Sequence, residues 1–333
     1  MAKTKNNNKV LILFCGGTIV MEEKADGSLA VPDSQDSAIE LLRNVEPRLS
    51  TIADYDIEFI ANIDSTNITP ADWDRILFKI KEKYRSYDGF VITHGTDTMA
   101  YTAAALSLTI KNLGKPVVLT GSQIPASKIE TDARLNLVNA FRVATLDISG
   151  VFIVFDQRII LGSKATKASE SSLDAFQTVN GEDAGEISIE IKIKPWVKKR
   201  IPHPHQIEIS PGFEHDIFVY TITPGCDPGD LEFLLNNEKI KGIIIRAYGT
   251  GNIPYGFEDF FKKAKQKKLP VVVTSQCLHG KTLMPLYDVG RKVLALGAIE
   301  GREQSLENLA VKLMWGLRHE PDQIEEIMNE KKN

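Results

Sequence analysis

The stretch GFVITHGTDTMAYTAAALSLTIKNLGKPVVLTGSQIP, residues 89–125, decides the fold. It begins with a short apolar run at 89–94, continues through a helical pattern at 97–112 and returns to an apolar run at 116–121. Parallel strands are buried on both faces of their sheet and are therefore continuously apolar, and a crossover helix joins each to the next. We predict two parallel strands connected by a helix.

The same alternation extends over the rest of the chain. Further strand patterns lie at 10–15, 56–62, 151–155, 216–222, 242–248 and 270–275, and helical patterns lie near 70–85, 130–145, 256–268 and 304–318. The first of these helices has the clearest beginning, with Thr69 as N-cap and Pro70 at the first helical position. The pattern predicts an α/β protein with a larger N-terminal flavodoxin-like domain, whose sheet is doubly wound and mostly parallel, and a smaller C-terminal α/β domain.

A change in composition suggests where the two domains divide. The segment KIKPWVKKRIPHPHQ, residues 192–206, concentrates Lys, Arg and Pro and loses regular periodicity, as a connector does. The total of 333 residues also exceeds what one core normally supports. We expect an N-terminal domain at 1–191, a linker at 192–213 and a C-terminal domain at 214–333.

Composition excludes several classes of partner. The net charge of −4 gives no cationic excess with which to bind nucleic acid or an anionic membrane. The three cysteines are far apart and form no CxxC pair, which favours a reducing, cytoplasmic compartment and no disulfide or zinc framework. The pair His203 and His205 is more typical of a charged linker than of a metal or RNA site. We expect a soluble partner or substrate, no metal and no cofactor.

Polar side chains gather just after four of the predicted strands. These loops are CGGTI at 15–19, DSTN at 64–67, HGTDT at 94–98 and GSQIP at 121–125. Ligands of α/β sheets bind at the carboxyl ends of the strands. The loops offer hydroxyl, amide and carboxylate groups with few cations, which suits a small zwitterionic molecule. Each loop alone also has a structural explanation as a tight turn or a helix cap, so only their combination indicates a site.

Lys167 offers a base for such a site. Its default interpretation is a solvated surface charge. Burial beside threonines would instead favour the neutral amine, which can accept a proton and activate an alcohol that is otherwise a weak nucleophile. Thr96, Asp97 and Lys167 could together form that base.

Several of these motifs resemble one family. CGGTI at 15–19, HGTDTMAYTAAAL at 94–106, TGSQIP at 120–125 and ATKASESSLDAF at 165–176 are similar to motifs of the bacterial-type L-asparaginase family, and within it of the cytoplasmic type I branch. Weaker matches continue through SLENLAVKLMWGL at 305–317, so that the resemblance spans nearly the whole chain.

The resemblance implies hydrolysis of L-asparagine to L-aspartate and ammonia, without a cofactor, through a threonine acyl-enzyme. Thr18 matches the nucleophile, and Thr96, Asp97 and Lys167 match the second catalytic group. The positions that match the substrate-binding residues are Gly17, Asp64, Ser65, Gly95, Ser122 and, from a neighbouring subunit, Asn252. The family forms homodimers or homotetramers. Type I members are also similar in having an allosteric asparagine site, whose matching positions here are Gln123, Thr166, Arg246 and Cys277.

One departure from the family pattern leaves two alternatives open. Family members carry a lid tyrosine about ten residues after the nucleophile, whereas this chain has Ser28 and Leu29 there and no tyrosine between Thr18 and Tyr55. A non-catalytic asparagine-binding or sensing protein is therefore one alternative. The other is the amidase component of an archaeal-type glutamyl-tRNA(Gln) amidotransferase, which shares these motifs but carries an extension before the first strand, where this chain has about nine residues.

Overall fold

The computed structural model describes residues 8–24, 26–32, 34–201 and 206–330, and the chain divides into two compact units, Met1–Pro211 and Gly212–Asn333. The expected linker, 192–213, belongs to the first unit up to Pro211. Its residues pack there: the Arg200 guanidinium donates to the carbonyl of Leu146, and β14 (Glu208–Ile209) pairs with β6 (Ile110–Lys111). His203 and His205 lie outside the described residues.

The first unit is built on an eight-stranded sheet in the order β13-β12-β9-β8-β7-β5-β1-β4. Five neighbouring strands are parallel: β4 (Asp54–Ile63), β1 (Lys9–Gly16), β5 (Gly89–Thr93), β7 (Pro116–Thr120) and β8 (Gly150–Phe155). The remaining three are antiparallel: β9 (Arg158–Leu161), β12 (Gly185–Ile187) and β13 (Ile191–Ile193). The predicted parallel sheet is confirmed, while the short antiparallel strands were not predicted.

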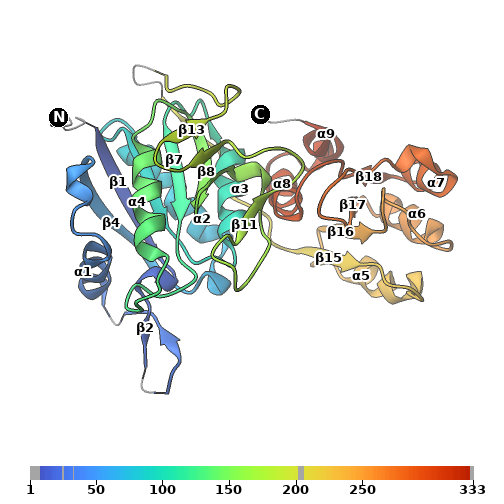
Figure 1. Ribbon diagram of the computed structural model, residues 1–333. Coiled ribbons are helices and arrows are strands. Elements are labelled where there is room, and N and C mark those ends of the chain that lie inside the picture. Colours follow the sequence, from blue (N-terminus) through green and yellow to red (C-terminus); the bar gives the residue numbers. More distant parts are fainter. Residues whose placement is uncertain (1–7, 25, 33, 202–205, 331–333) are drawn as a thin grey trace. The chain divides into compact units, whose positions relative to one another are not determined.

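Helices cover both faces of this sheet (Figure 1). Helices α2 (Pro70–Lys83) and α3 (Met99–Thr109) pack on one core, and α1 (Gln35–Val45) and α4 (Ala133–Ala144) pack on the other. Alternate residues of β1 pack in the two cores, with Leu11 in one and Ile12 in the other. Side chains of a strand point alternately to the two faces of the sheet, and both faces are buried here, which explains the continuous apolar run in β1.

The predicted beginning of α2 is confirmed. Thr69 is its N-cap, Pro70 is its first residue, and Thr69 and Asp72 form a capping box. Two small hairpins lie outside the main sheet: β2 (Glu22–Glu23) pairs with β3 (Leu29–Ala30), and β10 (Ala165–Lys167) pairs with β11 (Phe176–Thr178).

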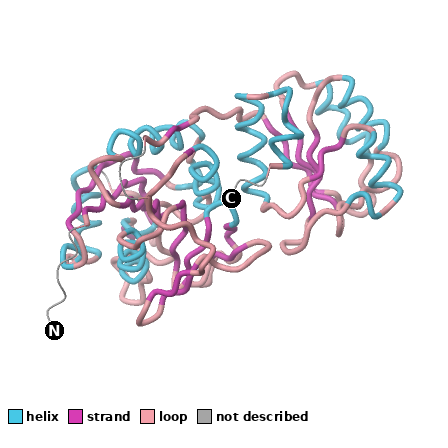
Figure 2. Tube along the Cα trace, turned by 90° about the horizontal axis from the view of Figure 1, so that it is seen from above, coloured by secondary structure: helices cyan, strands magenta, loops and turns pink. Residues whose placement is uncertain are grey.

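The second unit contains a four-stranded, fully parallel sheet. Its strands are β15 (Ile217–Thr221), β16 (Gly242–Ala247), β17 (Val271–Ser275) and β18 (Ala298–Glu300), in sequence order. Its helices are α5 (Glu232–Asn236), α6 (Glu258–Gln266), α7 (Asp288–Ala295), α8 (Leu306–His319) and α9 (Ile324–Asn329). In both units the strands run between helices (Figure 2), as the predicted α/β class requires. None of the helices in the described part of the chain has the length and apolar character needed to cross a membrane.

Candidate active site

Two glycines bring three of the strand-end loops into direct contact. Gly17, which follows β1, has φ +97°, and a Cβ atom placed on it would lie 2.6 Å from the backbone nitrogen of Gly95. A Cβ atom on Gly95 would lie 2.6 Å from the hydroxyl oxygen of Ser65. Neither position has room for a side chain, so the loops after β1, β4 and β5 pack against one another. Thr18 follows Gly17 directly, as the half-buried first residue of a short 3-10 helix, Thr18–Val20.

Lys167, Thr96 and Asp97 form one hydrogen-bonded group. The Lys167 amine donates to the Thr96 hydroxyl oxygen at 2.8 Å and to Asp97 Oδ1 at 2.7 Å. The Lys167 side chain is 17% exposed, whereas that of Asp97 is 55% exposed. Strand β10 holds this lysine by pairing with Phe176 of β11. The default interpretation of Lys167 as a solvated surface charge is therefore wrong.

Gln123 connects this group to the segment that follows Lys167. The buried Thr96 hydroxyl donates to Gln123 Oε1 at 3.1 Å, and Gln123 Nε2 donates to the carbonyl of Glu170 at 2.9 Å. The backbone N–H of Gln123 donates to the Asp132 carboxylate, which fixes the loop after β7. Gln123 was predicted only for the allosteric set, and its direct bond to Thr96 was not foreseen. Thr166, the neighbour of Lys167, is also buried.

The loop after β4 is both a capped turn and part of this cluster. Asp64 Oδ1 accepts the N–H of Thr66 at 3.0 Å, as expected of a polar turn. The Ser65 side chain is buried, and its carbonyl accepts the Thr98 hydroxyl at 2.7 Å. Thr98 occupies the N-cap of α3 without a side-chain capping bond, so the interpretation of this threonine as a helix cap is not realised. Ser122, after β7, is fully buried, and its hydroxyl has no hydrogen-bond partner among the described residues.

His94 was quoted in the HGTDT motif but not predicted as a site residue. Its ring is fully buried, Nδ1 lies 2.7 Å from the Gly95 carbonyl and Nε2 lies 2.8 Å from the Thr102 hydroxyl. Burial lowers the pKa of His94 to about 4, so the ring is neutral at physiological pH. The signal available in the sequence was its position, directly at the end of a buried strand and before the Gly-Thr-Asp-Thr turn.

The remaining predicted residues belong to the second unit. Asn252 donates its backbone N–H to the Tyr248 carbonyl at 2.7 Å. Arg246 lies near the carboxyl end of β16, and its buried Nε has no hydrogen-bond partner among the described residues. Cys277 follows β17, is exposed and donates its N–H to the Ser275 hydroxyl at 3.0 Å. The predicted allosteric set is thus divided, with Gln123 and Thr166 in the first unit and Arg246 and Cys277 in the second.

The segment after Thr18 forms the small hairpin of β2 and β3. Ser28, near the position of the expected tyrosine, donates its hydroxyl to Asp26 Oδ1 at 2.6 Å within the turn of the hairpin. An ion pair between Glu23 and Lys128 joins the hairpin to the loop after β7. A cavity of about 610 Å³ lies beside the 3-10 helix that begins at Thr18, and the sequence did not predict it. Its lining residues are Ile19, Val20, Met21, Leu41, Asn44, Val45, Ala126, Ser127, Ile129, Thr131 and Arg134.

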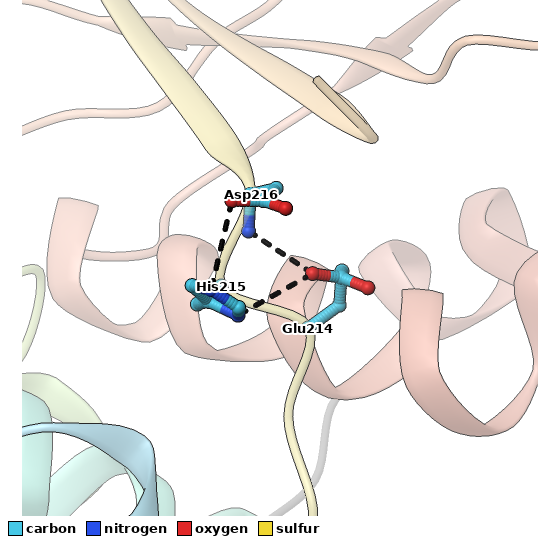
Figure 3. A group of neighbouring side chains, drawn as sticks. All are labelled: Glu214, His215 and Asp216. Atoms are coloured by element: carbon cyan, nitrogen blue, oxygen red, sulfur yellow. Dashed lines mark hydrogen bonds and ion pairs between the residues drawn. The ribbon is translucent and has the colours of Figure 1, made fainter. Parts of the chain in front are cut away.

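One group of metal-ligating side chains occurs among the described residues, at Glu214, His215 and Asp216 (Figure 3). Nδ1 of His215 faces Glu214 at 3.6 Å, whereas Nε2 faces Asp216 at 3.6 Å. The two ring nitrogens point in different directions, and the imidazole is 72% exposed. This arrangement is that of a surface ion-pair cluster.

Comparison with known proteins gives the class and then the family. The solved structure of L-asparaginase I from Vibrio cholerae superposes with a TM-score of 0.85 at 31% identity, covering 97% of each chain, so the protein has the fold of an amidohydrolase. Residues 9–198 match the family model "Asparaginase, N-terminal", and residues 216–328 match "Glutaminase/Asparaginase C-terminal domain". The chain belongs to the asparaginase family.

Curated relatives fall into two groups. The chain is 36% identical to L-asparaginase 1 of Escherichia coli (strain K12) over 320 residues, which covers 94% of this chain and 93% of that relative. It is also 36% identical over 318 residues to a component of the glutamyl-tRNA(Gln) amidotransferase of Methanosarcina mazei, which covers 93% of this chain and 74% of that relative. The resemblance to the type I branch is confirmed by the first relative and by the Vibrio structure.

Proposed function

We propose that the protein hydrolyses L-asparagine to L-aspartate and ammonia through an ester of Thr18. The observation that carries the proposal is the bonding of the Lys167 amine to both Thr96 and Asp97, in the turn that contacts Gly17, the residue before Thr18. An alcohol needs a positioned base before it attacks an amide, and this group supplies one.

The proposed reaction has two steps. In the first, the Thr18 hydroxyl oxygen attacks the side-chain carboxamide carbon, its proton passes to the departing nitrogen, and ammonia leaves. In the second, water attacks the resulting ester, the group of Thr96 and Lys167 accepts a proton of the water, and a proton returns to the Thr18 oxygen as its bond to the acyl carbon breaks and aspartate is released. Backbone N–H groups of the turn at 94–98 stabilise the oxyanion formed in each step. No metal or cofactor takes part.

Substrate binding is assigned to the same edge. Asp64 and Asp97 offer carboxylates to the α-amino group of asparagine, and Ser65 binds its α-carboxylate. The Ser122 hydroxyl is buried and finds no partner in the described part of the chain, which supports a role in binding the side-chain amide, because a buried polar group without a partner is costly. Gly17 and Gly95 line the pocket through their backbone, and Asn252 of a neighbouring subunit completes it.

The experiment that tests this function is ammonia release from asparagine. Thr18→Val removes the nucleophile and should lower kcat by at least about 10³-fold, as expected for a covalent catalyst that loses its attacking atom. Thr51→Val is the matched control, because Thr51 is an exposed threonine whose hydroxyl donates to the Arg48 carbonyl. The absence of ammonia from the unaltered protein at millimolar asparagine would disprove the proposal.

The same assay tests the alternatives. Relatives named as amidotransferase subunits support an amidase that uses a tRNA-bound substrate, and such an enzyme would release little ammonia from free asparagine. The serine at position 28, in place of an aromatic residue, supports a sensor, which would bind asparagine without turnover. Glutamine is assayed alongside, since one methylene changes binding by only about 1–3 kcal/mol.

We further propose regulation and assembly as in the type I branch. A second asparagine would bind at Gln123, Thr166, Arg246 and Cys277 and give sigmoidal kinetics, and the protein would act in the cytoplasm as a homodimer or homotetramer. The three free cysteines agree with a reducing compartment. Light scattering on the purified protein measures the oligomeric state.

A further inference from the structure

A buried chain of polar side chains crosses the core of the first unit and ends on the turn that carries Thr96. Trp73 Nε1 on α2 donates to the Thr102 hydroxyl on α3 at 3.0 Å. The Thr102 hydroxyl lies 2.8 Å from His94 Nε2, and His94 Nδ1 lies 2.7 Å from the Gly95 carbonyl. Exposure is 4% for Trp73 and 0% for Thr102 and His94, so water does not compete for these bonds.

The donor and the acceptor of each hydrogen bond in this series of side chains can be assigned. A carbonyl oxygen only accepts hydrogen bonds, so the proton of the neutral imidazole must lie on Nδ1 of His94. Nε2 is then an acceptor, and the Thr102 hydroxyl must donate to it. The Thr102 oxygen in turn accepts from Trp73, whose indole N–H is only a donor. The Gly95 carbonyl therefore selects the tautomer of His94, and Thr102 stabilises this tautomer by donating to the nitrogen that carries no proton.

We infer that His94 is a positioning residue that aims the backbone N–H of Thr96. The peptide between Gly95 and Thr96 is trans, as are all described peptide bonds, so its carbonyl and its N–H point in opposite directions. Because His94 holds the Gly95 carbonyl toward the core, the Thr96 N–H points away from the core, in the turn whose Gly95 contacts Gly17, the residue before Thr18. The inference deepens the proposed function, since an N–H held there is a preorganised oxyanion donor.

The packing around Gly95 does not fix the orientation of the peptide between Gly95 and Thr96. Gly95 contacts Ser65 on one side and the backbone at Gly17 on the other, and neither contact specifies a rotation of the peptide plane. The hydrogen bond from His94 does specify it. A rotation of the plane would leave the catalytic side chains in place while turning the donor away from the reacting oxygen, and small displacements of this kind reduce rates by about 10- to 100-fold.

The first test is spectroscopic and does not depend on activity. The full-length protein, labelled with ¹⁵N at its 6 histidines, should show one ring that is protonated on Nδ1 and does not titrate between pH 8 and pH 5. This signal should be absent in His94→Asn. A His94 ring protonated on Nε2, or one that titrates as a free histidine does, would overturn the inference even if the protein proved inactive toward asparagine.

The second test separates positioning from stability. Thr102→Val keeps the shape of the side chain but removes the donor to His94, and it should lower kcat about tenfold while leaving KM within about twofold, because the oxyanion exists only in the transition state. Thr102→Ser restores the hydroxyl and should restore kcat. Thr109→Val is the matched control: Thr109 is also fully buried on α3, and its hydroxyl donates to the Ala105 carbonyl.

The outcomes are distinguishable. Equal loss of kcat in Thr102→Val and Thr109→Val would show a general effect of destabilising α3 and would overturn the inference, as would full activity in Thr102→Val. If Thr102→Val fails to fold, His94→Asn and His94→Gln take its place: the asparagine amide can still donate to the Gly95 carbonyl from near the Nδ1 position, so it should retain more activity than glutamine. The opposite order would overturn the inference.

Discussion

The parallel strands of the two main sheets end at edges that differ in their chemistry. At the carboxyl edge of the first sheet, the side chains of Lys167, Thr96 and Gln123 are bonded to one another in a continuous network. At the carboxyl edge of the second sheet, Arg246 Nε, Tyr248 Oη and Thr250 Oγ1 are buried, and none has a hydrogen-bond partner among the described residues. Ser122 Oγ at the first edge is also buried without a partner among the described residues, so the difference lies in the bonded network of the first edge, which has no counterpart among these three groups of the second.

This difference separates what the fold provides from what the side chains provide. The parallel α/β sheet positions loops at its carboxyl edge in both units, so architecture alone does not identify an active site. A network whose members satisfy one another is preorganised before substrate binds. Buried groups without partners are costly in isolation and are satisfied when a ligand or another chain supplies the missing bonds. We therefore expect the chemistry and the binding of its substrate at the first edge, and the binding of a further ligand or chain at the second.

The largest expected effect comes from removing the amine of the first edge. Lys167→Met should lower kcat/KM by at least about 10³-fold in the ammonia assay, because Thr96 and Asp97 lose the amine that donates to both of them and the proposed base disappears. Lys164→Met is the matched control, since Lys164 is an exposed lysine three residues away whose amine donates to the Asn180 carbonyl. Comparable losses in the two variants would remove the basis for assigning catalysis to this edge.

A smaller effect is expected at the second edge. Arg246→Met removes a guanidinium whose Nε is buried and unpartnered among the described residues, and we expect the proposed sigmoidal dependence on asparagine to become hyperbolic while kcat at saturation changes by less than about threefold. The measurement is the initial rate over a wide range of asparagine concentrations. A loss of kcat as large as that of Lys167→Met would contradict the division of roles between the two edges.

Sequence patterns predicted the parallel part of the fold well, for a physical reason. The central strands are buried on both faces, so β1 and β5 are continuous apolar runs that stand out from the rest of the chain. The strands β12 and β13, with 3 residues each, are too short to show any periodicity. The same limit concealed β14, whose pairing places most of the expected linker within the first unit.

Site residues could be predicted where their side-chain type and the surrounding motif together indicate a catalytic role. Lys167 and Thr96 are 71 positions apart; their chemistry suggested a shared base, and the resemblance to family motifs gave both a catalytic role before the structure showed their bond. Gln123 and His94 were harder, because their importance lies in the partner of each polar atom. The bond from Thr96 to Gln123 and the bond from His94 to the Gly95 carbonyl depend on side-chain orientation, which no spacing in the sequence encodes.

The smallest expected effect concerns the stability of the first unit in acid. Hydrogen bonds from Arg48, and next from Arg134, lower the pKa of Glu46 from 4.5 to about 2. A carboxylate with a lowered pKa stabilises the fold above its unfolded pKa, and this contribution is lost as the pH falls from about 4.5 toward 2. Because both arginines are largely exposed, we expect only about 1 kcal/mol from the pairing.

Glu46→Gln should therefore lower the free energy of unfolding by about 1 kcal/mol at pH 7 and by much less at pH 3, where the wild-type carboxylate is itself losing its advantage. Urea unfolding at both pH values measures this difference. Glu40→Gln is the control, since Glu40 is an exposed glutamate of α1, the helix that ends just before Glu46. The substitution leaves the polar groups of the second edge untouched, so the sigmoidal kinetics should persist in Glu46→Gln. A Glu46→Gln variant with hyperbolic kinetics would show instead that the two edges respond to the stability of the first unit as a whole, and the contrast between them would no longer hold.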